Sequence, residues 1–293
     1  MKKKICFIIN PISGIGKQHK VEDLVKSFTE LQKFEIHFEY TKAPHHATEL
    51  SRNAASQGFD IVVAVGGDGS VNEVSKGLLG SQTALAILPA GSGNGLAWHL
   101  GIPLDLKKAL VLLLEGQVVK LDCGEIAGKH FVNVCGIGFD AHVAHLFANY
   151  GKRGFLSYVK LVQKAYLNYP EQEFNLQFES QKIERKALLI SIANGSQFGN
   201  NATISPLSDT NDGYMELCIL KKIPWYAALF FALRLFSKRA HRSKYIEIFR
   251  VKSMRVVSSC HEIHLDGEPV LEKEALDFKI IPSGIRILVP KRN

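Results

Sequence analysis

The sequence predicts two domains: an α/β domain at the N-terminus, with a parallel sheet and flanking helices, and a C-terminal antiparallel β-sandwich with helical inserts. Short apolar runs alternate with amphipathic stretches in the first third of the 293 residues, which is typical of strands that alternate with helices. From Gln117 onward, short strand-like runs are separated by turns, which is typical of antiparallel sheets. The 46% content of hydrophobic residues is enough for a sizeable core and excludes a disordered chain.

The N-terminal domain is expected over residues 1–116. Its expected strands are 4–9, 34–40, 61–65 and 84–88, and its expected helices are 17–31, 44–57 and 71–79. The run from Ile61 to Val65 is entirely apolar and mostly β-branched, as expected of a parallel strand buried on both faces. Residues 281–293 are expected to complete this domain through a strand at 285–289. Sheets of this kind bind ligands beyond the carboxyl ends of their strands.

The C-terminal domain is expected over residues 117–280 and is rich in strands. The expected strands are 118–126, 131–135, 174–178, 186–193, 214–220, 245–251, 253–258 and 262–265. Two helical inserts interrupt them, at 141–169 and 224–240. Since no linker rich in proline, glycine or serine separates the domains, we expect the two halves to pack closely.

The charge balance and the cysteines indicate the cellular setting. A formal net charge of +8 favours anionic partners such as nucleotide phosphates or acidic lipid headgroups. The five scattered cysteines form no metal-binding spacing and indicate a reducing compartment. The apolar run after Lys4 is too short for a signal peptide, and the run from Trp225 to Phe236 is too short to span a membrane. We therefore expect a cytoplasmic protein.

The strongest motif is a glycine-rich loop between an apolar strand and a helix, over residues 65–73. Gly66, Gly67 and Gly69 let the backbone turn sharply and bring N–H groups near a ligand, and the helix N-terminus adds partial positive charge. Asp68 within such a loop suits a Mg²⁺ ligand or a group acting on a phosphoryl group, although an aspartate also forms turns. The spacing of Ser70 and Glu73 predicts a capping box.

Two further loops follow predicted strands at the same edge of the sheet. Residues 10–17 read NPISGIGK, which lacks the first glycine and the final Ser or Thr of a Walker A loop and does not match GxGxxG. Residues 88–97 carry Gly91, Gly93 and Gly95, with Ser92 and Asn94 between them as hydrogen-bonding side chains. Each loop alone is a weak signal, whereas three loops at one sheet edge predict a single crevice.

A carboxylate pair and an apolar segment stand out in the C-terminal domain. Asp266 and Glu268 flank a glycine, so they form either a base with a metal ligand or a common Asp-Gly hairpin turn. The apolar segment at 224–236 runs into a basic cluster at 237–244. This pattern fits a helix that contacts an anionic membrane surface, and it equally fits a buried helix with a solvated end.

Taken in order, four motifs resemble the diacylglycerol kinase catalytic family, which includes bacterial lipid kinases, sphingosine kinases and ceramide kinases. They are NPxSG at 10–14, GGDGS-x-NE at 66–73, LPAGSGN-x-LA at 88–97 and LDGEP at 265–269. Residues 136–140, 198–200 and 211–213 also fit the family's second-domain pattern, so the resemblance covers nearly the whole chain. Ser92 stands where many bacterial members have threonine, and this GSGN version looks closer to the sphingosine and ceramide kinases.

The resemblance implies ATP and Mg²⁺ as cofactors and a lipid as acceptor. The implied nucleotide contacts are Asn10, Ser13, Gly14, Thr41, Gly66, Gly67, Asp68, Gly69, Ser70, Asn72, Ser92 and Asn94. In the implied catalytic set, Asp68 acts through Mg²⁺, and Asp266 deprotonates the lipid hydroxyl with Glu268 beside it. The family's bacterial members also hold a structural Mg²⁺, which maps onto Asp209, Asp212 and Tyr214. Transient membrane association follows from the lipid substrate.

Three alternatives to a lipid kinase are weighed against these motifs. A kinase resembling the NAD kinases would use a soluble acceptor, but NPxSG, LDGEP and the apolar segment at 224–236 argue against it. An inactive lipid-binding regulator is disfavoured because Asp68, Asp266 and Glu268 are all present. Nothing beyond net charge indicates a nucleic-acid partner. The sequence leaves open whether the chain forms a homodimer and which lipid is phosphorylated.

Overall fold

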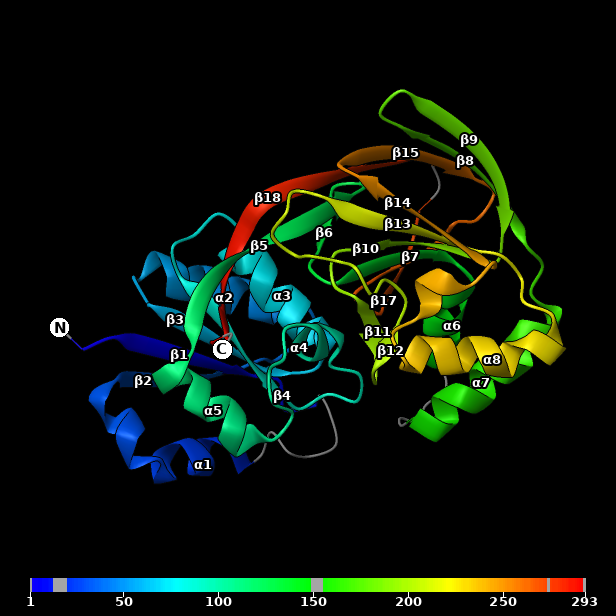
Figure 1. Cartoon of the computed structure of the whole chain (residues 1–293). Helices are drawn as coiled ribbons and strands as arrows, with labels where there is room; N and C mark the ends of the chain where they lie inside the picture. Colours follow the sequence, from blue (N-terminus) through cyan, green and yellow to red (C-terminus); the bar gives the residue numbers. More distant parts are fainter. Residues whose placement is uncertain (1, 13–19, 149–154, 273–274, 292–293) are drawn as a thin grey trace. The chain divides into compact units, whose positions relative to one another are not determined.

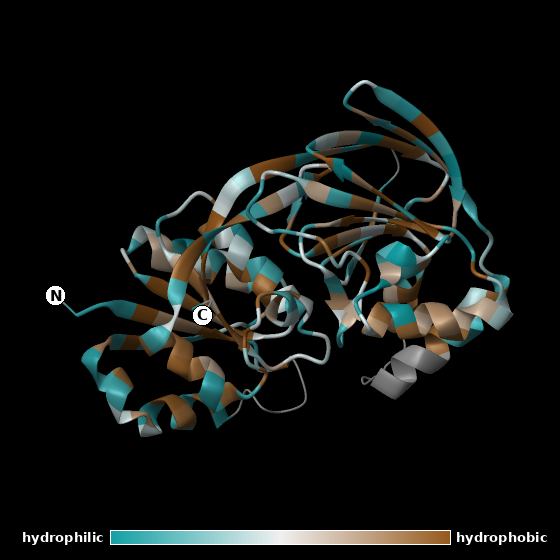
Figure 2. Cartoon of the chain, viewed as in Figure 1, coloured by the Kyte–Doolittle hydropathy of each residue, from teal (hydrophilic) through white to brown (hydrophobic). Residues whose placement is uncertain are grey.

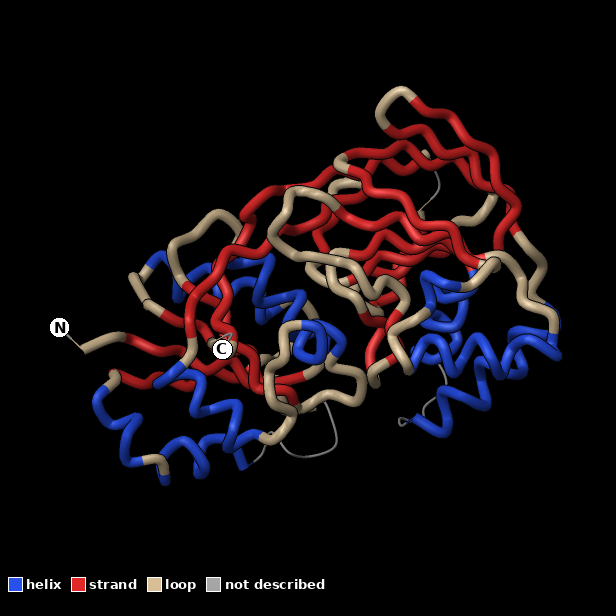
Figure 3. The backbone as a smooth tube through the Cα atoms, in the orientation of Figure 1, coloured by secondary structure: helices blue, strands red, loops and turns tan. Residues whose placement is uncertain are grey.

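The structure, a computed structural model, describes residues 2–12, 20–148, 155–272 and 275–291 (Figure 1). The chain divides into two compact units, one of Met1–Leu121 with Ser283–Asn293 and the other of Asp122–Pro282. Unit 1 alternates helices and strands, whereas strands predominate in unit 2 (Figure 3). The predicted fold class is confirmed: a mostly parallel α/β sheet is followed by an antiparallel sandwich.

Unit 1 is built on five strands in the order β2-β1-β3-β4-β18. Their bounds are Lys4–Ile9 for β1, Glu35–Tyr40 for β2, Ile61–Gly66 for β3, Ala84–Pro89 for β4 and Leu276–Val289 for β18. The pairings between neighbours in this order are parallel, and β18 joins β4 through its C-terminal part. Ile9 pairs with Val65, and Gly66 pairs with Pro89, so the strands end at one common edge. The loops that follow β1, β2, β3 and β4 therefore meet there.

Helices cover both faces of the unit 1 sheet. They are α1 (Val21–Ser27), the 3-10 helix η2 (Thr29–Lys33), α2 (His46–Ser56), α3 (Asp68–Leu78), α4 (Gly95–His99) and α5 (Leu106–Glu115). One face buries Phe7 and Val63 with Val25 of α1 and Leu110 of α5 in a single core. Helices α2 and α3 pack against each other and against β1 and β3. Every residue of β3 is buried, as a central parallel strand requires, and the middle of the unit 1 sheet is mostly brown, that is hydrophobic, in Figure 2.

Two helix predictions in unit 1 need correction. The helix expected at 17–31 is shorter, because Phe28 has an extended backbone that ends α1 at Ser27, and a 3-10 turn follows; residues 17–19 lie outside the described residues. The predicted capping box of Ser70 and Glu73 is wrong, because α3 starts earlier, at Asp68, with Gly67 as its N-cap. Glu73 instead accepts the backbone N–H groups of His45 and Ala47, at 3.0 and 3.1 Å.

Unit 2 is a sandwich of two antiparallel layers. One layer has the order β14-β13-β10-β7-β16-β17, with bounds Ile246–Val251, Met215–Leu220, Leu189–Ala193, Val134–Gly138, Glu262–Leu265 and Glu268–Leu271. The other contains β5 (Gln117–Ile126), β6 (Lys129–Phe131), β8 (Gln172–Phe178), β9 (Gln181–Ala187), β15 (Ser253–Ser258) and the first part of β18. Phe131, Phe174 and Phe178 of this layer share a core with Ile137 and Leu217 of the first. A two-strand ribbon of β11 (Gln197–Gly199) and β12 (Ala202–Thr203) completes the unit.

Two expected strands of unit 2 are each divided in the structure. The run 186–193 changes sheets at Leu188, so β9 ends in one layer and β10 begins in the other. The run 131–135 is divided between β6 and β7. Between them, residues 132 and 133 leave the strand ladder and turn their N–H groups toward Asp266. Both divisions depend on contacts with distant parts of the chain, which the local pattern of hydrophobic residues does not carry.

The inserts of unit 2 form α6 (Phe139–Ala148), α7 (Phe155–Asn168), α8 (Trp225–Phe236) and the 3-10 helix η3 (Ala240–Arg242). Residues 149–154, within the insert expected at 141–169, lie outside the described residues. Phe139 of α6, Tyr166 of α7 and Phe231 of α8 pack together with Leu220 on the outer face of the β7 layer. Within the described ranges, no helix has both the length and the apolar character needed to cross a bilayer.

Candidate active site

The first part of the candidate site lies at the edge of unit 1 where β1 and β2 end. The Asn10 N–H donates to the Val65 carbonyl at 3.3 Å, and its side-chain Oδ1 accepts the Ile12 N–H at 3.0 Å. The Thr41 N–H donates to the Ile9 carbonyl at 2.9 Å. Asn10 and Thr41 are therefore held at the same edge by the ends of neighbouring strands. The predicted contacts Ser13 and Gly14 lie outside the described residues.

The loops after β3 and β4 touch each other through their glycines. The N–H groups of Ala90 and Gly91 both donate to the Gly66 carbonyl, at 2.9 and 3.2 Å. A Cβ added to Gly67 would lie 3.2 Å from the Gly91 Cα, and a Cβ added to Gly91 would overlap the Gly67 backbone. No side chain fits at position 91, so the glycine there is a packing requirement. Two of the three predicted loops are thus brought together.

Asp68 and Asn94 organise the space beside this contact. Asn94 has a positive φ of 51°, and its side-chain amide both accepts the Gly91 N–H at 3.1 Å and donates to the Gly91 carbonyl at 2.8 Å. A Cβ added to Gly93 would lie 3.0 Å from Asp68 Oδ2, so the Asp68 carboxylate lies against the 92–94 turn. Ser92 is exposed on that turn. The arrangement places a carboxylate, a hydroxyl and loop amides at the N-terminus of α3.

The remaining predicted contacts of unit 1 differ in their exposure. Gly66 ends β3, and Gly69 lies in the first turn of α3. The side chains of Ser70 and Asn72 are buried within unit 1, and Asn72 is only 1% exposed. The N-terminal N–H groups of α3 and its helix dipole favour an anion at Gly67 to Ser70. The unit 1 edge thus has the features of a phosphate-binding site.

The second part of the candidate site is the β16–β17 hairpin of unit 2. Its two-residue turn is Asp266-Gly267, with φ values of 51° and 87°, between the paired residues Leu265 and Glu268. Asp266 is 6% exposed, and its carboxylate accepts three backbone N–H groups, from Val132 at 2.9 Å, Asn133 at 2.8 Å and Val134 at 2.9 Å. The segment is therefore both a hairpin turn and a buried carboxylate site. Glu268, half-buried, begins β17.

A buried His–Asp pair supports this turn and was not singled out from the sequence. His264 accepts the Gly267 N–H at Nδ1, at 3.2 Å, so its Nε2–H donates to Asp140 Oδ2, also at 3.2 Å. This pattern assigns the neutral imidazole with its proton on Nε2. A Cβ at Gly136 would overlap both Asp140 and His264. The pairing has no local signal in the sequence, because its two members are 124 residues apart.

Two cysteines of the same region, Cys123 and Cys135, have thiols with raised pKa values and low reactivity. Burial, reinforced by the charge of Asp266, raises the pKa of the Cys123 thiol. Burial and the charges of Asp140 and Asp266 raise the pKa of the Cys135 thiol well above its usual value. Both residues therefore stay protonated near neutral pH.

The residues predicted to hold a structural Mg²⁺ lie on the loop before β13. Asp212 Oδ1 accepts the Tyr214 N–H at 3.0 Å, and Oδ2 pairs with the Arg250 guanidinium. Asp209 Oδ1 accepts the Asn211 N–H at 3.1 Å. Among the residues described, no group of three or more His, Cys, Asp or Glu side chains could hold a metal ion. The Asp212 carboxylate is paired with Arg250, and the structural Mg²⁺ at Asp212 and the backbone oxygens of Asp209 and Tyr214 stays a prediction.

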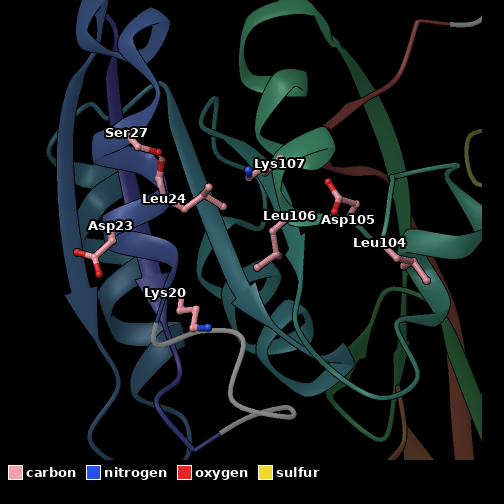
Figure 4. Close-up of a pocket in the computed structure, with 8 residues that line it drawn as sticks. All are labelled: Lys20, Asp23, Leu24, Ser27, Leu104, Asp105, Leu106 and Lys107. Atoms are coloured by element: carbon pink, nitrogen blue, oxygen red, sulfur yellow. Dashed lines mark hydrogen bonds between the residues drawn. The ribbon is translucent and has the colours of Figure 1, made fainter.

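A surface pocket of unit 1 lies elsewhere. It is lined by residues along α1, from its N-cap Lys20 to Ser27, and by the start of α5, with Leu24 and Leu106 among its lining residues (Figure 4). Asp105 on its rim caps α5 by accepting the Lys108 N–H. None of the predicted site residues lines this pocket. It therefore does not contribute to the candidate site.

Comparison of this sequence with known proteins leads to the same family as the motifs. The profile of the diacylglycerol kinase catalytic domain matches residues 4–126, and that of the YegS C-terminal NAD kinase beta sandwich-like domain matches residues 133–289. The chain is 29% identical over 276 residues to a diacylglycerol kinase of Bacillus subtilis, covering 91% of this chain and 90% of that protein. It is 30% identical over 268 residues to a protein of Citrobacter koseri named "Probable lipid kinase YegS-like", covering 87% of each.

The fold agrees as well. The crystal structure of a diacylglycerol kinase from Bacillus anthracis matches with a TM-score of 0.74 at 21% identity, covering 98% of this chain and 97% of that one. The resemblance inferred from the four motifs is therefore confirmed. The chain belongs to the diacylglycerol kinase catalytic-domain family and carries the C-terminal domain of the YegS-like lipid kinases.

Proposed function

We propose that the protein is an ATP-dependent lipid kinase that transfers the γ-phosphoryl group of ATP to a hydroxyl of a membrane lipid. The observation that carries this proposal is the Asp266-Gly267 hairpin, in which three backbone N–H groups hold a buried carboxylate next to Glu268. In a chain of this family, two carboxylates held in one hairpin turn by backbone hydrogen bonds support a catalytic role for Asp266 and Glu268. The five cysteines are all free thiols, which supports a location in the reducing cytoplasm, where ATP is available.

The nucleotide is proposed to bind at the unit 1 edge. Phosphate oxygens would take hydrogen bonds from the amides of the Gly66–Gly69 loop and from the N-terminus of α3, with Ser92 and Asn94 on the facing turn. Asn10 and Thr41, at the ends of β1 and β2, would contact the rest of the nucleotide. Asp68 suits Mg²⁺, because its carboxylate lies beside Gly93 at the N-terminus of α3, where the phosphates are proposed to bind. When bound, Mg²⁺ would neutralise charge on the phosphates.

The base is proposed to come from the carboxylate pair of the hairpin. A carboxylate has about four lone-pair positions, and the three backbone N–H groups occupy three of those of Asp266. These three hydrogen bonds hold the Asp266 carboxylate in place, so its proposed role is to fix the turn. Glu268, half-buried at the start of β17, is proposed to accept the proton of the lipid hydroxyl. Asp266 was expected to be the base, and the geometry favours dividing the two roles in this way.

Transfer of label from γ-labelled ATP and Mg²⁺ to extracted membrane lipids tests the proposal. The wild type is expected to label a lipid, and Glu268→Gln to reduce the rate by about a hundredfold or more. Asp266→Asn is expected to reduce it as well, because its amide nitrogen cannot accept the N–H groups. Glu179→Gln is a matched control, since Glu179 is an exposed carboxylate on the β8–β9 hairpin. NAD is offered in parallel as a soluble acceptor.

The two rival readings give different results in the same assay. Labelling of NAD with no labelled lipid would replace the proposal with a soluble acceptor. Binding of ATP without labelling of any acceptor would favour a regulator that has lost catalysis.

A further inference from the structure

Helix α8 is apolar on two opposite faces. One face packs into unit 2 through Phe231, which is 6% exposed, and through Ala227 and Leu235. The other carries six large side chains that remain exposed: Trp225, Tyr226, Leu229, Phe230, Leu233 and Phe236. Their spacing follows the period of an α-helix, so they form one continuous stripe. Trp225 is 84% exposed and Phe230 is 71% exposed, which is not the buried helix that the sequence equally allowed.

Exposed cations surround the end of this stripe. They are Arg234, Lys238, Arg239, Arg242 and Lys244. No acidic residue occurs in the sequence between Glu216 and Glu247. In the described part of the chain, the ion pairs include none of these five residues. The Arg234 guanidinium donates to the Arg242 carbonyl at 3.0 Å, which ties η3 and its cations to the helix.

We propose that α8 docks the protein on an anionic lipid surface. The apolar stripe lies in the boundary between headgroups and acyl chains, and the five cations meet lipid phosphates at the same depth. The 12-residue helix is too short to span a bilayer, so it lies in the plane of the interface. This inference rests on the proposed function only for the reason why the protein would dock on lipid. The docking itself can be measured separately, because binding to vesicles requires neither ATP nor catalysis.

Charge argues against a second copy of the chain as the occupant of this face. The common symmetric dimer would place the same patch of both copies in contact. Five uncompensated cations from each α8 would then face one another, and like charges at an interface oppose association. An anionic bilayer supplies both an apolar phase and the missing negative charge. The combination of stripe and cations therefore fits lipid better than protein.

The docking helix is also connected to the acceptor hairpin within unit 2. Phe231 of α8 packs in the same cluster as Phe139. The next residue, Asp140, accepts the hydrogen bond from His264, which in turn holds the Gly267 N–H. A lipid surface at α8 is thereby linked by direct packing to the turn that carries Glu268.

Tryptophan fluorescence offers a direct test, because the chain has only two tryptophans. In a Trp98→Phe variant, Trp225 is the sole reporter. Vesicles of phosphatidylcholine with phosphatidylglycerol are expected to shift its emission to the blue and to expose it to quenching by brominated acyl chains. Pure phosphatidylcholine vesicles are expected to bind on the order of tenfold more weakly. No shift and no quenching with anionic vesicles would overturn the proposal, and so would equal binding to neutral ones.

Matched variants test the two components of the surface. Leu229→Ser with Phe230→Ser is expected to weaken vesicle binding by about tenfold or more, since both side chains are exposed and neither contributes to the core. Lys238→Glu with Arg239→Glu is expected to weaken it by about tenfold or more. Leu207→Ser, at the same 71% exposure as Phe230, and Lys182→Glu are controls elsewhere on unit 2.

Each remaining outcome has a defined meaning. Equal losses in the controls would overturn the proposal. A blue shift that depends on protein concentration without vesicles would assign the face to a second copy. Vesicle docking that fails while the protein still phosphorylates lipid dispersed in detergent would reject the docking surface and leave the kinase proposal standing. Docking on anionic vesicles without phosphorylation of any lipid would support the docking surface and reject the kinase proposal.

Discussion

At the scale of single residues, the candidate site depends on side chains that fit because a glycine faces them. Gly91 lets the loops after β3 and β4 touch, and Gly136 leaves room for the Asp140–His264 pair. The carboxylates at positions 68, 266 and 268 could be selected from the sequence, since they occur in recognisable motifs. Their partners could not, because the N–H groups that hold Asp266 belong to residues 132–134, more than a hundred positions away. A hydrogen bond between such distant positions has no local signature.

The substitution Gly136→Ala tests the support of the hairpin. The new methyl group would overlap Asp140 Oδ2 and His264 Nε2, so the buried pair must separate. Overpacking of this kind costs about 1–3 kcal/mol, which urea unfolding would measure. Kinase activity is expected to fall as well, because His264 no longer holds the Gly267 N–H.

A double-mutant comparison provides the control for this prediction. In a background of Asp140→Ala and His264→Ala, the space facing Gly136 is empty, so Gly136→Ala is expected to cost much less. An undiminished cost in that background would show that the glycine is needed for its backbone conformation, and that the overlap with the pair is irrelevant.

At the scale of elements, the predicted strands agree with the structure better than the predicted helix ends. The short, mostly β-branched apolar run at 61–65 predicts a buried strand, and β3 begins where the sequence places it. Helix starts depend on more than the local pattern: α2 begins where Glu73 of α3 accepts its N–H groups, and α3 begins at Asp68, directly after the extended backbone of Gly67. Strands 129–131 and 134–138 separate where Asp266 requires backbone donors. The boundaries that differ from expectation are thus set by tertiary contacts.

Glu73 is expected to act as a cap supplied by a neighbouring helix. Its carboxylate accepts two N–H groups at the N-terminus of α2, where negative charge also complements the helix dipole. Glu73→Ala is expected to lower the free energy of unfolding by about 0.5–2 kcal/mol, measured by urea denaturation. Glu73→Gln should lose less, because its carbonyl oxygen can still accept one N–H. Glu49→Ala, an exposed carboxylate on α2 itself, is the control, and an equal loss there would refute the capping role.

At the scale of the whole molecule, two strands belong to both compact units. The boundary between the units falls at residues 121 and 122, within β5, and at residues 282 and 283, within β18. Each unit has its own core, and each holds one part of the candidate site. The order of motifs along the sequence predicts both units, because three nucleotide motifs precede the LDGEP motif. It does not predict whether the units open together or separately, since that depends on the free energy of each core.

The alkylation rates of the buried cysteines test whether the two units open together, and they also test which unit binds the nucleotide. Burial raises the pKa of Cys6 in unit 1 and of Cys218 in unit 2 to about 12, so both react with alkylating reagents only after local opening. Cys260 is less buried and should react first, as an internal reference. Local opening removes the burial that raises the pKa, so an opened thiol has the usual cysteine pKa of about 8.5. Labelling of Cys6 and Cys218 should therefore accelerate about tenfold per pH unit below that value and level off above it.

Mg²⁺ and ATP at a hundred times the dissociation constant are expected to slow the labelling of Cys6 in mild urea by about a hundredfold. Only the state that binds nucleotide is stabilised, so Cys218 should keep its rate if the two units open independently. Mass spectrometry of the alkylated peptides measures both positions in one sample. Equal protection of the two cysteines would show that the units open as one cooperative structure. If ATP binds but protects Cys218 and leaves Cys6 unchanged, the nucleotide site does not lie at the edge of unit 1.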